Sequence, residues 1–236
     1  IKNLFRLLVI NNTQNEIDTV NFWRDCFERF GHMPNSSSKF KRIANASDRE
    51  QLNDYLAEIR YALIFAGLGF QVDIEPLGEK GPDLKISRNG YGIFVEVSRF
   101  RLVNAGPGKV STHLEEYGNL EKEFIKTLEK ILSKFKQVGD KNSAIAIWND
   151  DECIDELAPR FAVKHLSDGK NRKVYQVPDN LLFVIYGSNW INTSQKKQLY
   201  CYPLQILEEP LLNLKKELES DNVSGLIQKV LNQVEA

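Results

Sequence analysis

Three acidic residues, Glu58, Asp83 and Glu96, have the residue types and surroundings that suit metal chemistry. Glu96 lies within the apolar run "YGIFVEVSRF", and Asp83 follows a Gly-Pro pair. Burying an unpaired carboxylate costs several kcal/mol, so an acid inside a buried strand is expected to have a compensating cation. Two acids that converge from adjacent strands are typical of a Mg²⁺ site, with positions left for water and a phosphate.

Strand geometry favours this convergence. Successive side chains of a strand point to opposite faces, so Phe94, Glu96 and Ser98 share one face of their strand. Asp83 and Lys85 share a face of the neighbouring strand for the same reason. A hairpin between the two strands can bring these faces together.

Glu58 lies on a predicted helix that begins at Ser47 and ends at Gly67. Ser47 and Glu50 have the spacing of a capping box, in which each side chain bonds the other residue's backbone N–H. Glu58 falls at the edge of the apolar stripe of this helix, from which it can point toward the sheet. The alternative is an ordinary acid flanking that stripe at the surface.

Simpler explanations stay open for the other two acids as well. Asp83 can be a turn residue after Gly-Pro. Glu96 can be an exposed strand acid or can pair with Arg99 or Arg101. The three acids together, in this order on these elements, are less easily explained in this way.

The elements that must position these acids follow the order helix, three strands, helix, strand. Asn-Gly at residues 89–90 predicts a tight hairpin between the second and third strands. These elements are expected at residues 47–67, 70–75, 83–87 and 91–100, within 112–138, and at 143–149. The continuous apolar runs at 143–149 and 181–187 predict strands covered on both faces.

Three regions are expected along the chain. Residues 1–46 form an N-terminal helical extension, with a helix over 15–31 and a loop at "PNSSSKFKR". Residues 47–190 form an α/β core. Residues 191–236 form a C-terminal helical segment packed on that core. The amphipathic pattern of residues 203–236 leaves one further alternative, a structural interaction protein that forms a homodimer through this tail.

The order of acids and elements resembles the PD-(D/E)XK nuclease superfamily. Glu58, the "PD" of Pro82 and Asp83, and the "EVS" that begins at Glu96 carry the resemblance over residues 47–149. The resemblance implies a restriction-endonuclease-like mixed sheet flanked by helices, with an αβββαβ core. It also implies Mg²⁺ or Mn²⁺ held by Asp83, Glu96 and the Val97 carbonyl. Glu58 would orient the water shell of the metal or help to bind a second ion.

The activity that the resemblance implies is hydrolysis of phosphodiester bonds in nucleic acid. DNA is the expected substrate, in restriction, repair or defence. The chain departs from the family at Ser98, where the motif has a lysine. Lys85 is the best substitute because it shares the face of Asp83, and Lys122 is another candidate. An alternative register takes Glu75 as the first acid and "DLK" as the second motif.

The missing lysine also motivates an alternative function, a catalytically inactive relative that binds nucleic acid or a protein partner. Contacts to nucleic acid are expected from Lys109 in "GPGK", and from Lys122, Arg99 and Arg101. The run "GKNRK" at residues 169–173 predicts a basic loop.

Composition limits the other classes of function. The 236 residues are 42% hydrophobic and 27% charged with a net charge of −1, which is typical of a globular protein and excludes a globally basic nucleic-acid binder. No apolar run is long enough for a membrane helix. The three cysteines are far apart, which predicts a reducing, cytoplasmic location without disulfides. The first residues do not resemble a signal peptide, and the absence of an initiator Met suggests a start within a longer protein.

Overall fold

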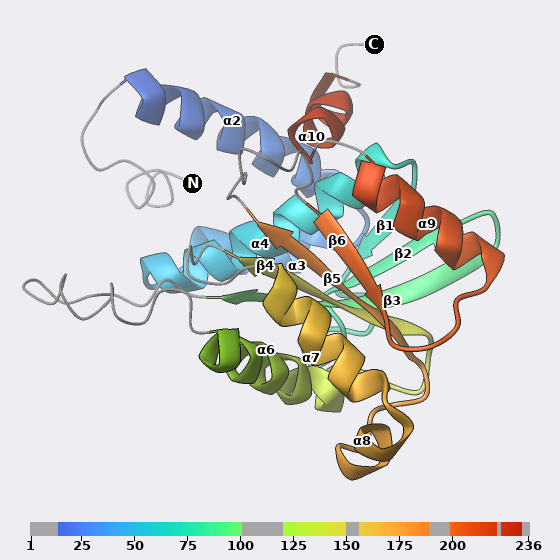
Figure 1. Ribbon diagram of the computed structural model, residues 1–236. Helices are drawn as coiled ribbons and strands as arrows, with labels where there is room; N and C mark the ends of the chain where they lie inside the picture. The colour runs from blue at the N-terminus through green and yellow to red at the C-terminus, as the bar shows by residue number, and fades with distance from the viewer. Residues whose placement is uncertain (1–13, 101–119, 150–155, 189–198, 221–222, 233–236) are drawn as a thin grey trace, which may run out of the picture. The chain divides into compact units, whose positions relative to one another are not determined.

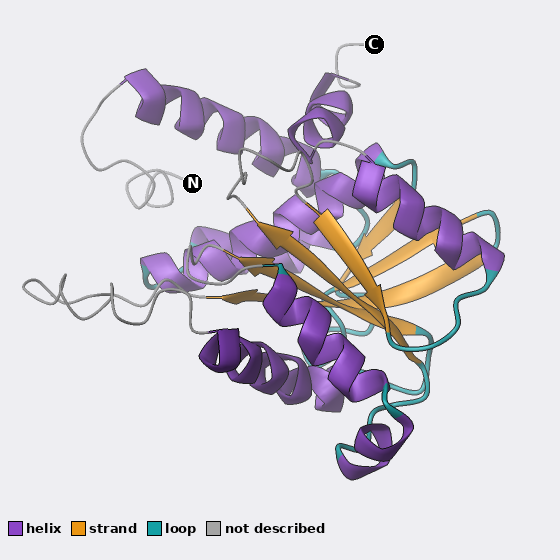
Figure 2. Cartoon of the chain, viewed as in Figure 1, coloured by secondary structure: helices purple, strands orange, loops and turns teal. Residues whose placement is uncertain are grey.

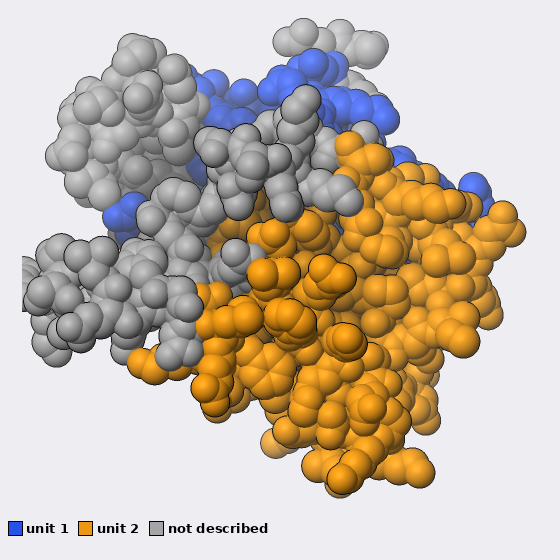
Figure 3. All heavy atoms as spheres, viewed as in Figure 1, with its two compact units in different colours: residues 1–97, 222–236 blue, residues 98–221 orange. Residues whose placement is uncertain are grey.

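The computed structural model describes residues 14–100, 120–149, 156–188, 199–220 and 223–232. The chain divides into two compact units (Figure 3). Unit 1 comprises residues 1–97 and 222–236, and unit 2 comprises residues 98–221. Helices flank strands that pair in both antiparallel and parallel fashion, so the expected α/β class with mixed strand pairing is confirmed (Figure 2).

Unit 1 contains helices from both ends of the chain. They are α2 (Gln14–Gly31), α3 (Ser36–Ala44), α4 (Arg49–Gly67) and α10 (Val223–Leu231) (Figure 1). Helix α10 packs against the end of α4 so closely that a Cβ at Gly67 would lie 2.5 Å from the Leu226 carbonyl oxygen. Lys229 donates a hydrogen bond to the Gly67 carbonyl at 3.1 Å. A cation at the C-terminal end of a helix is favourable, and the contact holds α10 in this unit.

The strands of unit 1 form an antiparallel meander. Strand β1 (Gln71–Ile74) pairs with β2 (Leu84–Arg88), which pairs with β3 (Tyr91–Phe100). Asn89 and Gly90, with φ of 54° and 79°, form the predicted hairpin turn. One face of the meander is apolar and almost fully buried, and consists of Val72, Ile74, Leu84, Ile86, Ile93 and Val95. The three predicted strands are therefore confirmed, and β3 continues to Phe100 beyond the boundary of the unit.

The helix expected from Ser47 begins slightly later, and the predicted capping box is wrong. Asp48 is the N-cap residue, and its carboxylate accepts a hydrogen bond from the Gln51 backbone N–H at 2.8 Å. The Gln51 side chain in turn accepts one from the Ser47 backbone N–H at 2.8 Å. Ser47 and Glu50 have the right spacing, but Asp48 accepts hydrogen bonds more strongly because its oxygens are charged.

The segment predicted as a loop at "PNSSSKFKR" is largely helical, as α3. The three serines suggested a turn, but Ser36 donates its hydroxyl to the Gly31 carbonyl at 2.9 Å. Ser36, Lys39 and Ile43 are buried at helical spacing, and Phe40 packs edge-on against Phe27. Tertiary packing therefore makes this polar stretch helical.

Unit 2 is built around two parallel strands. Strand β4 (Ser143–Asn149) pairs in parallel with β5 (Leu181–Ser188), and β5 pairs antiparallel with β6 (Leu199–Pro203). Every residue of β4 and β5 is buried, which confirms the prediction of strands covered on both faces. The helices of this unit are α6 (Leu120–Lys134), continued by the 3₁₀ turn Phe135–Gln137, and α7 (Leu157–Ser167), α8 (Gly169–Val174) and α9 (Glu209–Ser220).

Several elements of unit 2 differ from expectation. The predicted basic loop at 169–173 is the short helix α8, which begins where the Asp168 carboxylate accepts a hydrogen bond from the Lys170 backbone N–H at 3.0 Å. Helix α7 and strand β6 were not predicted. Of the C-terminal segment 191–236, α9 belongs to unit 2 and α10 to unit 1. Among the described residues, no helix is both long and apolar enough to cross a membrane.

Candidate active site

Asp83 connects the three strands of unit 1. It lies just before β2, and its carboxylate Oδ2 accepts a hydrogen bond from the Val97 backbone N–H of β3 at 2.9 Å. Its carbonyl accepts one from the Glu75 backbone N–H, at the end of β1, at 2.7 Å. The side chain of Asp83 is thus held at the point where β1 ends and β2 begins.

Glu58 approaches Asp83 from helix α4. Only 12% of its side chain is exposed, which confirms that it turns away from solvent rather than flanking the helix at the surface. The partner that joins it to Asp83 was not predicted. It is Lys39, from α3, whose ammonium forms an ion pair with Glu58 Oε2.

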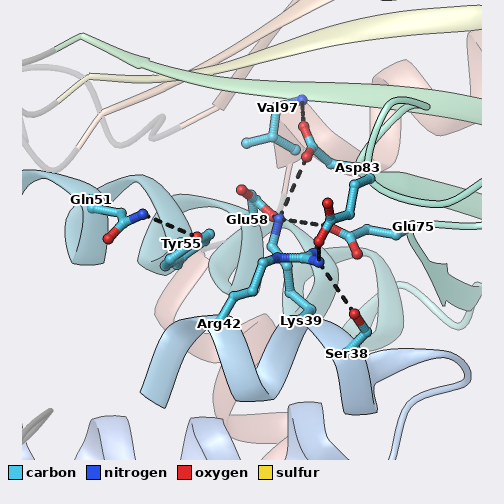
Figure 4. A network of polar contacts seen from close by, with 10 residues as sticks. Ser38, Lys39, Arg42, Gln51, Tyr55, Glu58, Glu75, Asp83 and Val97 are labelled. Carbon is cyan, nitrogen blue, oxygen red and sulfur yellow. Dashed lines mark hydrogen bonds and ion pairs between the residues drawn. The ribbon is translucent and has the colours of Figure 1, made fainter. Parts of the chain in front are cut away.

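Lys39 lies among three carboxylates (Figure 4). Besides its ion pair with Glu58, its Nζ is 3.1 Å from Glu75 Oε1 and 3.7 Å from Asp83 Oδ1. It also lies over the Tyr55 ring, 5.0 Å from the ring centroid, which is a favourable cation–π distance. Lys39 is only 4% exposed, so this ammonium exchanges its hydration for carboxylate oxygens from three separate elements.

A second cation, Arg42, extends the network by one helical turn. Its guanidinium forms ion pairs with Glu75 and with Glu79. Glu75 therefore lies between Lys39 and Arg42, whereas Glu79 is 68% exposed and marks the outer end of the network. We call Lys39, Arg42, Glu58, Glu75 and Asp83 the Lys39 network.

Burial and charge act in opposite directions on the pKa values in this network. Burial raises the pKa of Glu58 well above its usual range, and the charge of Asp83 adds to this, while Lys39 opposes it. Burial alone would lower the pKa of Lys39, but Glu58, Asp83 and Glu75 outweigh it and raise that pKa. Burial would also raise the pKa of Glu75, yet Arg42 and Lys39 lower it. Lys39 and Glu75 are therefore ionised at neutral pH.

Glu96 and Val97 lie next to this network on β3. At this end of the hairpin the last paired residues are Leu84 of β2 and Val95 of β3. Asp83 comes directly before Leu84 in the sequence, and Glu96 comes directly after Val95. Glu96 is 2% exposed, which excludes the alternative that it is a strand acid exposed to solvent. Because side chains alternate along a strand, it points to the face opposite Val95 and Val97. The ion pairs of Lys39 are with Glu58, Glu75 and Asp83 rather than with Glu96.

Lys85, the first substitute expected for the missing lysine, is not a member of the Lys39 network. Ser98 and Lys85 are half-buried on β3 and β2. Lys85 pairs in register with Phe94 and with Asp73. The lysine beside Asp83 is Lys39 instead. Sequence reasoning missed it because it assigned residues 34–42 to a loop, although the spacing of Ser36, Lys39 and Ile43 was a usable helical signal.

The residues expected to bind nucleic acid differ in exposure. Lys122 is exposed on α6. Arg99 is 4% exposed, so its guanidinium is buried at the end of β3. Lys109 and Arg101 lie outside the described residues.

The oxygens of Glu58 and Asp83 are suitable ligands for Mg²⁺, since they already converge on one cation, the Lys39 ammonium. Within the described ranges, no group of three or more His, Cys, Asp or Glu side chains has the arrangement of a metal site. The cation that these carboxylates share in this structure is a lysine.

Comparison with protein-family models, with curated proteins and with solved structures finds no match to this chain. The likeness to PD-(D/E)XK nucleases therefore depends on the motif residues and the order of elements.

Proposed function

We propose that this chain is a Mg²⁺-dependent nuclease that hydrolyses phosphodiester bonds, with DNA as its expected substrate. The observation that supports this best is the position of Lys39. Its ammonium lies within ion-pair distance of Glu58 and Asp83, two of the three acids singled out by the motif. In this proposal Lys39 supplies the positive charge that Ser98 cannot supply.

Each residue has a defined role in this proposal. Asp83 and Glu58 would provide carboxylate oxygens for the metal, and Glu96 and the Val97 carbonyl would be further ligands. A bound Mg²⁺ would supply a water of lowered pKa and would stabilise charge on the leaving oxygen. Lys39 has three N–H donors, with which it can orient a water or a phosphate oxygen beside Asp83.

The proposal is tested by cleavage of single-stranded DNA, duplex DNA and RNA with Mg²⁺ or Mn²⁺. Asp83→Asn and Lys39→Met should each reduce cleavage on the order of a hundredfold or more, as for other charge-stabilising groups. Asp25→Asn is the control, because Asp25 is an exposed acid of the same unit. Equal, background-level cleavage by wild type and Asp83→Asn on all three substrates would refute the proposal.

A second candidate is a nuclease-fold protein that binds nucleic acid or a protein partner without cleaving. The same contact supports it, because a lysine already neutralises the carboxylates that would hold the metal. Calorimetric titration with Mn²⁺ separates the two. Binding that Asp83→Asn abolishes supports the nuclease, and no binding by the wild type supports the inactive relative. Glu96→Gln should weaken binding less than Asp83→Asn, since Glu96 lies outside the Lys39 network.

We also infer a cytoplasmic location. Cys26 and Cys201 are buried free thiols in different units, which suits a reducing compartment. Fractionation of cells that produce the chain tests this inference, and measurement of the solution mass tests the alternative of a homodimer formed through the tail.

A further inference from the structure

Glu75 has a backbone conformation that is unusual for its residue type. It follows β1 directly, and its φ of 45° lies in the left-handed region that non-glycine residues seldom adopt. Such conformations cost free energy and persist where the surrounding structure imposes them. Two hydrogen bonds impose this one. The Glu75 N–H donates to the Asp83 carbonyl at 2.7 Å, and its own carbonyl accepts from the Gly78 N–H at 2.9 Å.

This conformation directs the Glu75 side chain toward both cations of the network. Its Oε1 is 3.1 Å from Lys39 Nζ and also forms an ion pair with Arg42. The side chain is only 10% exposed, so these ion pairs are shielded from water. Glu75 thus binds Asp83 through its backbone and Lys39 through its side chain, and the spacing between the two depends on it.

We propose that Glu75 is a positioning residue that holds Lys39 beside Asp83, and that keeps it there when a divalent cation takes the carboxylates of Glu58 and Asp83. The second part of this inference rests on the proposed function. A metal and the Lys39 ammonium compete for the same oxygens of Glu58 and Asp83, so Lys39 needs another anion to remain in the site. Glu75 is that anion.

This role differs from the one that the alternative sequence register gave to Glu75. As the first acid of that register it would be a metal ligand. In the structure, Oε1 of Glu75 is shared by two cationic side chains, and a divalent cation at the same oxygen would be repelled by both. Loss of Glu75 should therefore affect Lys39 more than it affects the affinity for metal.

The test measures how fast an acetylating reagent modifies Lys39, with mass spectrometry of the peptides. Lys41 is exposed on the same helix and serves as the internal standard. In metal-free protein, Lys39 of the wild type should react far more slowly than Lys41. Glu75→Gln should speed its reaction about tenfold, because a charged hydrogen bond is lost. Glu79→Gln, which removes the exposed partner of Arg42, should have no effect.

Adding saturating Mn²⁺ tests the second part. Lys39 of the wild type should stay protected, whereas in Glu75→Gln it should react nearly as fast as Lys41. Calorimetry should show similar Mn²⁺ affinity for both proteins. Two results would overturn the inference. One is that Lys39 of the wild type reacts with the acetylating reagent once Mn²⁺ is bound, and the other is that Glu75→Gln has a greatly reduced affinity for Mn²⁺.

The two proposals can fail separately. If Mn²⁺ does not bind the wild type, the nuclease proposal fails, and the metal-dependent part of the inference fails with it. The labelling without metal still decides whether Glu75 positions Lys39. If Lys39 is labelled at the same rate in Glu75→Gln and Glu79→Gln without metal, the positioning role of Glu75 is wrong.

If the Glu75→Gln protein does not fold, the Glu75→Asp variant replaces it. Its charge is kept but its reach is shorter, so an intermediate rate is expected, and a wild-type rate contradicts the inference.

Discussion

Lys39 in unit 1 and Lys215 in unit 2 each form an ion pair with a glutamate, and their surroundings differ. In unit 2, Lys215 pairs with Glu219 one turn along α9. Lys215 also donates to the Cys201 carbonyl at 2.9 Å, and Glu219 accepts from the Cys201 N–H at 3.1 Å. Strand β6, which contains Cys201, stands at one end of the strand order. This pair therefore satisfies the backbone of a terminal strand, which would otherwise be open to pairing with another chain.

Lys39 in unit 1 has a different kind of surroundings. Its ionic partners are side chains from α4, from the end of β1 and from the start of β2, and it is far less exposed than Lys215. Of these partners, Asp83 also accepts the Val97 backbone N–H of β3 at 2.9 Å, whereas Glu58 and Glu75 meet Lys39 through their side chains. The partners of each ion pair, rather than its presence, distinguish the structural role of Lys215 from the role in catalysis that we propose for Lys39.

The largest expected difference between the two lysines is in stability. Lys39→Met leaves three carboxylates around a missing cation and should lower the free energy of unfolding by about 3–5 kcal/mol, as for other broken buried pairs. Lys215→Met removes a half-exposed pair and should cost about 1 kcal/mol or less. Urea denaturation measures both, with the exposed neighbour Lys216→Met as control. Equal losses for Lys39 and Lys215 would remove the distinction.

A divalent cation should sharpen the difference. If the carboxylates around Lys39 can hold a metal, Mg²⁺ should replace the missing charge in Lys39→Met. At a hundredfold excess over its dissociation constant, it should restore about 2.7 kcal/mol. Lys215→Met should gain no more than the wild type. The measurement is the same urea titration with and without Mg²⁺, and an identical gain by all three proteins would contradict the expectation.

The structural role of the Lys215 pair has its own local test. Glu219→Ala removes the acceptor of the Cys201 N–H, which is worth about 1 kcal/mol. Hydrogen exchange at the Cys201 amide should then be about fivefold faster. Glu58→Gln, in the other unit, should leave that amide unchanged. A Cys201 amide that exchanges at the wild-type rate in Glu219→Ala would show that the pair does not hold the strand.

The two buried cysteines report on the two units separately. Burial raises the pKa of Cys26, in unit 1, and of Cys201, in unit 2, to about 12. At pH 8 both are protonated and inaccessible, so iodoacetamide should label them only after unfolding. Lys39→Met should speed labelling of Cys26 more than that of Cys201, and Lys215→Met should do the reverse. Mass spectrometry reads both sites, and parallel changes would mean that the units unfold together.

The same thiols predict a pH dependence of the free energy of unfolding. Their folded-state pKa lies above the unfolded value of 9.0, so the folded state binds the proton more tightly. The stabilisation is complete below pH 9 and is lost as the pH rises toward about 12. Cys26→Ser and Cys201→Ser variants, compared with the wild type across this range, should show a shallower fall in stability.

The sequence by itself predicted the elements whose patterns are local. Alternation and continuous apolar runs located β1 to β5, and Asn-Gly fixed the β2–β3 turn. Helical spacing located α2, α4 and the described part of the long helix. These patterns depend on which face of an element is buried, and the periodicity of one segment records that directly. The acids Glu58 and Asp83 were identified differently, by the order of acids and elements that carries the family resemblance.

Only the tertiary structure decided which cation lies beside those acids. Lys39 belongs to a serine-rich segment whose own pattern suggested a loop, and its helix is stabilised by packing on α2. Its partners Glu58, Glu75 and Asp83 are 19, 36 and 44 residues further along the chain. Ion pairing requires distances of a few ångströms between side chains, and no local periodicity records such distances. The chemistry of the site depends on how distant segments pack together.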